Sequence, residues 1–231
     1  MIDSLTVKPG TSARLRERDP GDTLELEKED GKHRLGELHD RLDVLQQRLY
    51  AEGRRSVLLV LQGIDGSGKD GVIRRVFSGL NPQGCRVASF KAPSTSELAH
   101  DYLWRVHAVT PRRGEIGVFN RSHYEDVVTV RVLQLAPNEI WSRRAGHIRE
   151  WERLLVDEGT SFVKVFLNIS RDEQRRRLQE RIDNPEKRWK FRLEDLDIRK
   201  RFDDYLDAYE QAITETSTDW APWYVVPADR N

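Results

Sequence analysis

Residues 56–69 read Ser-Val-Leu-Leu-Val-Leu-Gln-Gly-Ile-Asp-Gly-Ser-Gly-Lys, and this stretch decides the fold. It begins with a short apolar run, rich in Val and Leu, that is typical of a buried strand. A glycine-rich turn follows at once and ends at Lys69, where helical spacing begins. The order strand, glycine loop, helix is the context in which such a loop binds phosphate.

The loop fits the pattern G-x-x-x-x-G-K, with Asp70 where Ser or Thr is usual. Glycines allow backbone N–H groups to turn inward around an anion, and the helix that starts near Lys69 adds its positive N-terminal end. Lys69 is expected to reach a terminal phosphate, so the expected ligand is a polyanion. The other residues assigned to phosphate binding are Gly63, Gly66, Ser67, Gly68 and Asp70.

Two carboxylates in this loop are unusual, because a carboxylate beside a bound phosphate is repelled unless a cation lies between them. Mg²⁺ is the expected mediator, since it takes one or two carboxylates together with phosphate oxygens and water. Asp65 is the predicted metal ligand, with a hydrogen bond inside the loop as the alternative. For Asp70, a metal role and stabilisation of the first helical turn are both open.

A second polar cluster, 120–126, follows a predicted strand at 115–119. Ligands of open α/β sheets bind beyond the carboxyl ends of the strands, so this cluster is expected to face the phosphate loop. Arg121 can form a forked contact with a phosphate; the alternative is a structural salt bridge. Three residues are assigned to the nucleotide, namely Asn120, Glu125 and Asp126. For Glu125 and Asp126 the alternative is stabilisation of a first helical turn.

The charge balance is uneven although the 231 residues have a formal net charge of zero. Residues 171–201 hold 12 Lys and Arg against 8 Asp and Glu, whereas residues 202–231 hold 1 against 7. Arginine pairs bidentately with phosphate or carboxylate. The basic segment therefore indicates either an anion-binding surface or a solvated helix with internal ion pairs.

Strands that alternate with helices predict an α/β fold with a mostly parallel sheet covered on both faces. Leu residues at helical spacing also predict an amphipathic helix over 32–52, whose apolar stripe should pack on the body or on a second subunit. A charged segment with Pro185, 183–192, reads as an inserted loop or lid. The five predicted strands are 56–62, 86–91, 115–119, 161–169 and 223–226, and the further helices are 69–80, 97–106, 124–135, 139–157, 171–182 and 193–216.

Residues 1–31 show little periodicity and are predicted to be a mostly irregular N-terminal segment, followed by one domain over 32–231. Cys85 is the only cysteine, so no internal disulfide can form, and the start of the chain has no apolar leader-like region. The longest apolar run, 57–61, is far shorter than the roughly 20 residues that span a bilayer. We expect a cytoplasmic protein with no membrane partner and no nucleic-acid partner.

Four motifs together resemble the polyphosphate kinase 2 family. They are GIDGSGKDG in the loop, FKAPS at 90–94, FNRSHYEDV at 119–127 and RRRLQERIDNPEKRWKF at 175–191, and their order and spacing match over about 35–228. The resemblance implies a P-loop kinase-like three-layer sandwich with a five-stranded sheet and a helical lid at about 178–196. It also implies transfer of phosphate from inorganic polyphosphate to nucleoside mono- or diphosphates with Mg²⁺. Independently of the resemblance, we expect a homo-oligomer, either dimer or tetramer.

Residue by residue, Asp65, Lys69 and Arg121 correspond to the family's loop aspartate, loop lysine and phosphate-binding arginine. Asn120 stands where many members have an aspartate, and the sequence around it resembles that of members that accept both AMP and ADP. The resemblance assigns four residues to a basic lid that binds polyphosphate, namely Arg176, Arg177, Arg181 and Lys190.

Phosphoryl transfer requires in-line positioning and neutralisation of charge more than covalent chemistry. We therefore assign no histidine a catalytic role and interpret His123 as a positioning residue. An ATP-dependent nucleotide or small-metabolite kinase is the alternative enzyme, because the same loop would serve it. A non-catalytic protein that only senses a phosphate ligand is the alternative from another class, and Asp65, Lys69 and Arg121 argue against it.

Overall fold

The structure is a computed structural model that describes residues 2–230. Its centre is a six-stranded sheet of order β1-β6-β5-β2-β4-β3. All neighbouring strands run parallel except β1, which pairs antiparallel with β6. The strands are β1 (Thr6–Val7), β2 (Ser56–Gln62), β3 (Cys85–Ser89), β4 (Ile116–Asn120), β5 (Thr160–Asn168) and β6 (Trp223–Pro227).

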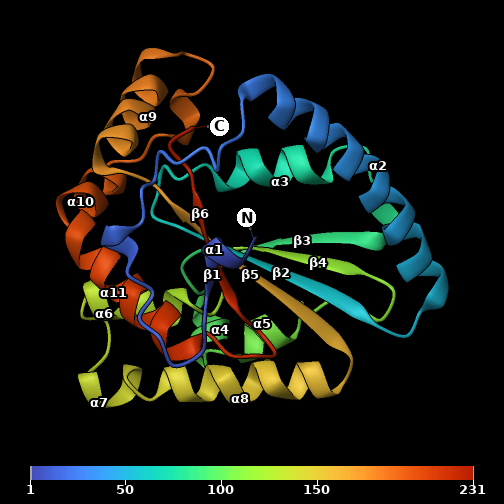
Figure 1. Cartoon of the computed structure of the whole chain (residues 1–231). Helices are drawn as coiled ribbons and strands as arrows, with labels where there is room; N and C mark the ends of the chain where they lie inside the picture. Colours follow the sequence, from blue (N-terminus) through green and yellow to red (C-terminus); the bar gives the residue numbers. More distant parts are fainter. Residues whose placement is uncertain (1, 231) are drawn as a thin grey trace.

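Helices cover both faces of the sheet, as the predicted three-layer architecture requires. Figure 1 shows α2 and α3 on one face and α8 on the other. The α-helices are α1 (Ile2–Leu5), α2 (Lys28–Glu52), α3 (Lys69–Phe77), α4 (Thr95–Leu98), α5 (Trp104–His107), α6 (Glu125–Val132), α7 (Asn138–Trp141), α8 (Arg144–Asp157), α9 (Arg171–Asp183), α10 (Glu194–Lys200) and α11 (Phe202–Thr216). Three 3₁₀ turns complete the described elements: η1 (Leu15–Glu17), η2 (Pro82–Gly84) and η3 (Arg188–Lys190).

The predicted five-stranded sheet is corrected to six strands, because the N-terminal segment adds β1. Val7, Ala13 and Leu15 of this segment are buried in the main core. Glu210 of α11 holds the segment in place, since its carboxylate accepts hydrogen bonds from the backbone N–H groups of Arg14 and Leu15. Residues before the long helix therefore belong to the packed body, although most of them lack regular structure.

Three predicted helices are each divided in two. The predicted helix 97–106 becomes α4 and α5, because the Asp101 carboxylate accepts hydrogen bonds from the N–H groups of Leu103 and Trp104 and so starts a new turn. The predicted helix 139–157 becomes α7 and α8, and 193–216 becomes α10 and α11. The other predicted helices and all five predicted strands are present, with ends shifted by a few residues.

The main core lies between the sheet and the layer of α6, α8 and α11. Leu58 and Val60 of β2 and Phe166 of β5 pack there with Ile148 of α8 and Ile213 of α11. Complete burial of side chains of this size stabilises the fold by roughly 1.5–3 kcal/mol each. A smaller cluster on the opposite face joins the sheet to α3. The two clusters hold β2 on both faces and thereby fix the loop that leaves its carboxyl end.

Helix α2 keeps much of its apolar stripe at the surface: Leu35, Leu38 and Leu45 are exposed, whereas Gln46 is buried against η2. The predicted packing of the stripe on a second subunit stays a prediction. Among residues 2–230, no helix is both long and apolar enough to cross a bilayer.

Candidate active site

The loop between β2 and α3 is a compact turn built on glycines with positive φ angles. The φ angles of Gly63, Gly66 and Gly68 are 153°, 95° and 96°. A Cβ atom on Gly63 would lie only 2.5 Å from the Ser67 hydroxyl oxygen. The Ser67 N–H closes the turn by donating to the Ile64 carbonyl oxygen at 2.9 Å. Only glycine therefore fits the close approach at position 63.

Lys69 begins α3 and its side chain turns back under the loop. Its Nζ donates to the Gly63 carbonyl oxygen at 2.7 Å and lies 3.8 Å from Asp65 Oδ1. Only 8% of Lys69 is exposed. Burial is the main reason that the pKa of Lys69 lies below its usual value, and Arg121 adds to the effect while Asp65 opposes it. Burial deprives the Lys69 ammonium of the water that would stabilise its charge. An anion that enters the loop would compensate that charge.

Arg121 lies opposite the loop, immediately after β4. It has a φ of 62°, a left-handed conformation that is uncommon for a residue other than glycine and that costs of order 1 kcal/mol. Its backbone N–H donates to the Leu61 carbonyl oxygen of β2 at 3.1 Å. This backbone conformation directs the guanidinium to Asp65, with which it forms a salt bridge, and to Glu125 Oε2 at 3.8 Å.

Asp65 is the carboxylate on which the cations converge. Burial alone would raise its pKa, but Lys69 and Arg121 more than offset this and hold the pKa below its usual value. Arg181 of α9 lies near enough to lower that pKa further. The structure thus brings together the three residues that the sequence predicted to be catalytic, and it brings Arg181 toward them.

Asn120 and Asp70 form a second contact at the same edge. The Asn120 amide nitrogen donates to Asp70 Oδ1 at 2.8 Å. An amide makes this contact as a donor, whereas a carboxylate at position 120 would require a proton or a cation in between. The Asn at this position therefore changes how Asp70 is held beside the phosphate loop.

Glu125 is held at the edge of the site by several polar groups. Its Oε2 accepts from the Thr129 hydroxyl at 2.7 Å. Its Oε1 lies 3.0 Å from the Gln62 amide group, which donates to it when its nitrogen faces Glu125. Glu125 is thus fixed next to Arg121, and its assignment to the nucleotide stays a prediction.

Asp126 is paired with two arginines, and its assignment to the nucleotide stays a prediction. Its carboxylate lies 3.5 Å from Arg105 and 4.0 Å from Arg144. Burial raises the pKa of Asp126 above its usual value, although both arginines act against this. The Arg105 guanidinium also donates to the Lys91 carbonyl oxygen, so Asp126 joins α6 to the loop that contains FKAPS.

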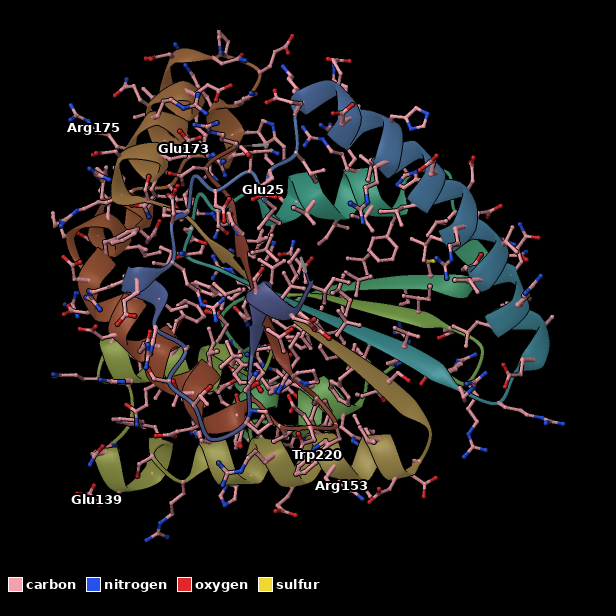
Figure 2. The ribbon with its side chains drawn as sticks, viewed as in Figure 1. Glu25, Glu139, Arg153, Glu173, Arg175 and Trp220 are labelled. Carbon is pink, nitrogen blue, oxygen red and sulfur yellow. The ribbon has the colours of Figure 1, made fainter. Side chains whose placement is uncertain are left out.

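The basic residues of α9 divide between two faces. Arg181 pairs with Asp195 of α10 at 3.3 Å on the side of the loop. Arg176 instead pairs with Glu173 and Glu180 and is largely exposed. It lies with Arg175 along a shallow surface concavity of about 790 Å³, and Figure 2 shows Arg175 at the outer edge of α9. The Arg176 guanidinium is thus engaged by carboxylates on the outer face, and its assignment to polyphosphate stays a prediction.

Arg177 also differs from its predicted role. Its guanidinium donates to the carbonyl oxygens of Gly66, Ala228 and Asp229, and its Nε donates to Glu173 at 2.7 Å. These contacts leave no side of its fork for a chain of phosphates. Lys190 is exposed, with its Nζ 5.1 Å from the ring centre of Trp189, and its role in the lid stays a prediction.

One residue of the site was missed from sequence. Gln174 of α9 is fully buried and donates from its amide to the Asp65 carbonyl oxygen at 2.9 Å. Its spacing of three and seven residues from Arg177 and Arg181 places the three on one helical face. The sequence therefore indicated that these three residues share one face of α9. It could not show that this face packs against the phosphate loop.

The glycine loop, the lysine at the start of α3 and the arginine beyond β4 define a P-loop phosphotransferase. The family model described as polyphosphate kinase 2 matches residues 25–231. The chain belongs to the polyphosphate kinase 2 family.

Proteins and structures with high similarity agree with this. The AMP/ADP-polyphosphate phosphotransferase of Meiothermus ruber is 58% identical over 227 residues, which are 97% of this chain and 85% of that protein. The ADP-polyphosphate phosphotransferase of Rhodopseudomonas palustris is 53% identical over 202 residues, 82% of this chain and 70% of that protein. The crystal structure of polyphosphate kinase 2 from Arthrobacter aurescens TC1 superposes with a TM-score of 0.94 at 44% identity, covering 99% of this chain and 82% of that one.

Proposed function

We propose that this protein transfers the terminal phosphate of inorganic polyphosphate to AMP and ADP. The observation that carries the proposal is the convergence of Lys69 and Arg121 on Asp65 at the carboxyl ends of β2 and β4. Cations held in this way can neutralise the negative charge on a phosphoryl group during its transfer. The names of relatives such as the Meiothermus ruber enzyme support polyphosphate as the donor and adenine nucleotides as acceptors.

In this mechanism the protein acts by positioning and by charge. The N–H groups of the glycine loop and Lys69 hold the transferred phosphate, and Arg121 contacts it from the opposite side. The acceptor oxygen belongs to a nucleotide phosphate, which is already anionic, so no side chain needs to remove a proton. His123, which is fully buried, is therefore given no part in proton transfer.

The loop residues fit a magnesium ion that is held mainly by phosphates. The described residues contain no group of three or more His, Cys, Asp or Glu that could hold a metal ion by itself. Mg²⁺ needs only one or two carboxylates when phosphates and water complete its shell. The Ser67 hydroxyl is buried and has no hydrogen-bond partner among residues 2–230. Asp65 would hold the ion, which would supply further neutralisation of phosphate charge.

The donor and the acceptor would use different parts of the site. Arg181 and Lys190 of the lid are assigned to the polyphosphate chain. Asn120 and Glu125, which lie beside Arg121 and Asp70, are assigned to the nucleotide. This division predicts that lid variants affect the donor more than the acceptor.

A direct test compares phosphate donors and acceptors in one assay. Purified protein is given Mg²⁺, long-chain polyphosphate and AMP, ADP, GMP or GDP, and the nucleotide products are separated and quantified. We expect AMP to yield ADP and ADP to yield ATP. Turnover with ATP as donor that is faster than with polyphosphate would contradict the proposal and favour an ATP-dependent kinase. No turnover with either donor would favour a sensor.

Replacing Asp65 with asparagine is expected to raise the Mg²⁺ concentration needed for half-maximal rate. A neutral amide is a poorer ligand for a hard cation than a carboxylate, and it also leaves Glu125 as the remaining ion-pair partner of Arg121. The measurement is the initial rate as a function of Mg²⁺ at saturating ADP and polyphosphate. A Mg²⁺ titration curve that matches the wild type would assign Asp65 to the structure of the loop instead.

Replacing Arg181 with alanine is expected to raise the KM for long polyphosphate and to weaken its dependence on salt. Each phosphate that a cation neutralises releases counterions, so fewer contacts give a flatter slope. The KM for ADP should change less than twofold. Rates are measured against polyphosphate at two salt concentrations, with the exposed Arg175→Ala as the matched control. Equal salt slopes for wild type and Arg181→Ala would contradict the donor role.

The remaining expectations concern the protein as a whole. A cytoplasmic location, a dimer or tetramer in solution and the lack of a nucleic-acid partner stay predictions. We expect a contact between subunits to involve α2, because its Leu35, Leu38 and Leu45 are exposed.

A further inference from the structure

The outer side of the phosphate loop is held by two side chains of α9. The Asp65 carbonyl oxygen accepts from the Gln174 amide at 2.9 Å, and the Gly66 carbonyl oxygen accepts from the Arg177 guanidinium at 3.1 Å. These are consecutive carbonyls at the apex of the loop. Their donors lie three residues apart on α9, on one face of the helix.

The orientation of these carbonyls determines where the loop N–H groups point. In a trans peptide unit, the C=O and the following N–H point in opposite directions. An Asp65 carbonyl that faces α9 therefore turns the Gly66 N–H toward the interior of the loop. A Gly66 carbonyl that faces α9 likewise turns the Ser67 N–H inward, where it donates to Ile64 at 2.9 Å. The contacts with α9 thus preserve the geometry that binds phosphate.

Both side chains are themselves held in place. Gln174 is fully buried, and its Cγ lies 3.2 Å from where a Cβ on Gly66 would be. The Arg177 side chain is only 11% exposed, and Glu173 accepts from its Nε. The same guanidinium donates to the carbonyl oxygens of Ala228 and Asp229. One side chain therefore connects the phosphate loop, α9 and the segment that follows β6.

The first two turns of α9 are attached to the body of the protein. The Ser170 N–H donates to the Asp229 carboxylate at 2.7 Å, and the Ser170 hydroxyl accepts from the Glu173 N–H at 3.1 Å, which caps the helix. Arg181, one turn beyond Arg177, contacts α10 instead. The first half of α9 therefore supports the loop, and its second half contacts α10.

We propose that Gln174 and Arg177 are positioning residues for phosphoryl transfer. They keep the carbonyls of Asp65 and Gly66 on the outer side of the loop, so that the loop is already shaped for phosphate when the lid closes. The role rests on the proposed transfer reaction, and neither residue needs to touch a substrate.

The test uses variants of graded severity in the full chain. Gln174→Met keeps the length and bulk of the side chain but removes the donor. Arg177→Lys keeps the charge and one donor nitrogen in place of three, whereas Arg177→Ala removes both the charge and all donors. Arg175→Ala is the matched control, because Arg175 lies on the outer face of the same helix (Figure 2). Initial rates are measured against ADP and against polyphosphate, and folding is followed by thermal unfolding.

We expect kcat to fall about tenfold for Gln174→Met, the scale of one neutral hydrogen bond. For Arg177→Ala we expect about a hundredfold, the scale of a misplaced reacting group. Arg177→Lys should recover part of the loss. The KM for ADP should stay within about twofold in all variants, because the acceptor side of the site is untouched. Arg175→Ala should keep the kcat of the wild type.

Two results would overturn the proposal. One is a wild-type kcat in folded Gln174→Met and Arg177→Lys. The other is a loss of rate that only parallels the loss of folded protein, which would make the contacts purely structural. If the wild type itself transfers no phosphate from polyphosphate, the proposed function fails, and inorganic tripolyphosphate then tests the contacts alone. In that case, loss of its protection against thermal unfolding in Gln174→Met supports the positioning role, and retained protection overturns it.

Discussion

Replacing Lys69 with methionine is expected to lower turnover by at least about a hundredfold, the scale of losing one preorganised charge that stabilises a transition state. Methionine fills a similar volume, so the buried position stays packed. What is lost is the ammonium group, which lies 2.7 Å from the Gly63 carbonyl oxygen and 3.8 Å from Asp65. In the variant, Arg121 remains as the cation paired with Asp65. A phosphate bound in the loop loses its contact with the Lys69 ammonium.

The measurement is kcat at saturating ADP, polyphosphate and Mg²⁺, together with the melting temperature. Lys32→Met is the matched control, since Lys32 lies on the exposed face of α2 and pairs only with Glu29 among the described contacts. We expect the control to behave as the wild type. If Lys69→Met is folded and keeps more than half of the wild-type turnover, Lys69 has no role in transfer.

The phosphate loop was predictable from sequence because all of its determinants are local. The strand 56–62, the glycines and Lys69 are contiguous, and the backbone conformations that they need follow from residue type alone. Arg121 was predictable for a related reason: it follows the next inner strand, and parallel strands bring their carboxyl ends to the same edge. The burial of Lys69 was not, because it depends on how the loop folds back over the side chain.

The roles of the arginines on α9 could not be predicted in the same way. Arg176, Arg177 and Arg181 have the same chemistry and lie within two turns, so composition indicates a basic surface for all of them. Their different roles follow from the rotation of α9 about its axis. That rotation is set by tertiary contacts such as the buried Gln174 and the carbonyls of Ala228 and Asp229.

The sixth strand illustrates a further limit. Strand β1 is only two residues long, Thr6–Val7, and gives no periodic signal. It is held by contacts with residues about two hundred positions away, including the bond from the Ser217 hydroxyl to the Val7 carbonyl oxygen. Pairing at that sequence separation is invisible to local pattern, which is why the N-terminal segment reads as irregular.

Replacing Lys164 with methionine is expected to destabilise the protein by about 3–5 kcal/mol, the usual cost of leaving a buried charge without its partner. Lys164 and Glu152 are both fully buried and lie 2.7 Å apart between β5 and α8. Lys164 also donates to the Thr216 carbonyl oxygen, and Tyr124 donates to Glu152. Without the ammonium group, the Glu152 carboxylate must be buried unpaired or take up a proton.

The pH dependence of this effect has a definite sign. In the wild type, burial would raise the pKa of Glu152, but Lys164 and His123 hold it below its usual value. The contribution of Glu152 to stability is therefore present at neutral pH and is lost as pH falls. Burial also lowers the pKa of Lys164, although Glu152 opposes this. In Lys164→Met the pKa of Glu152 should rise above its value in the unfolded chain. The variant therefore gains stability as pH falls, and the difference in unfolding free energy from the wild type should be smaller at pH 5 than at pH 8.

Urea unfolding of the wild type, Lys164→Met, Glu152→Gln and the double variant at both pH values tests the pair. The double variant should be more stable than the sum of the two single effects predicts, because it contains no buried charge at either position. Additive losses, or a difference that does not change with pH, would mean that the two groups are not coupled. Lys164 also donates to the hydroxyl of Tyr124, which lies three residues after the left-handed Arg121. Loss of the ion pair should therefore displace Arg121 and lower kcat as well.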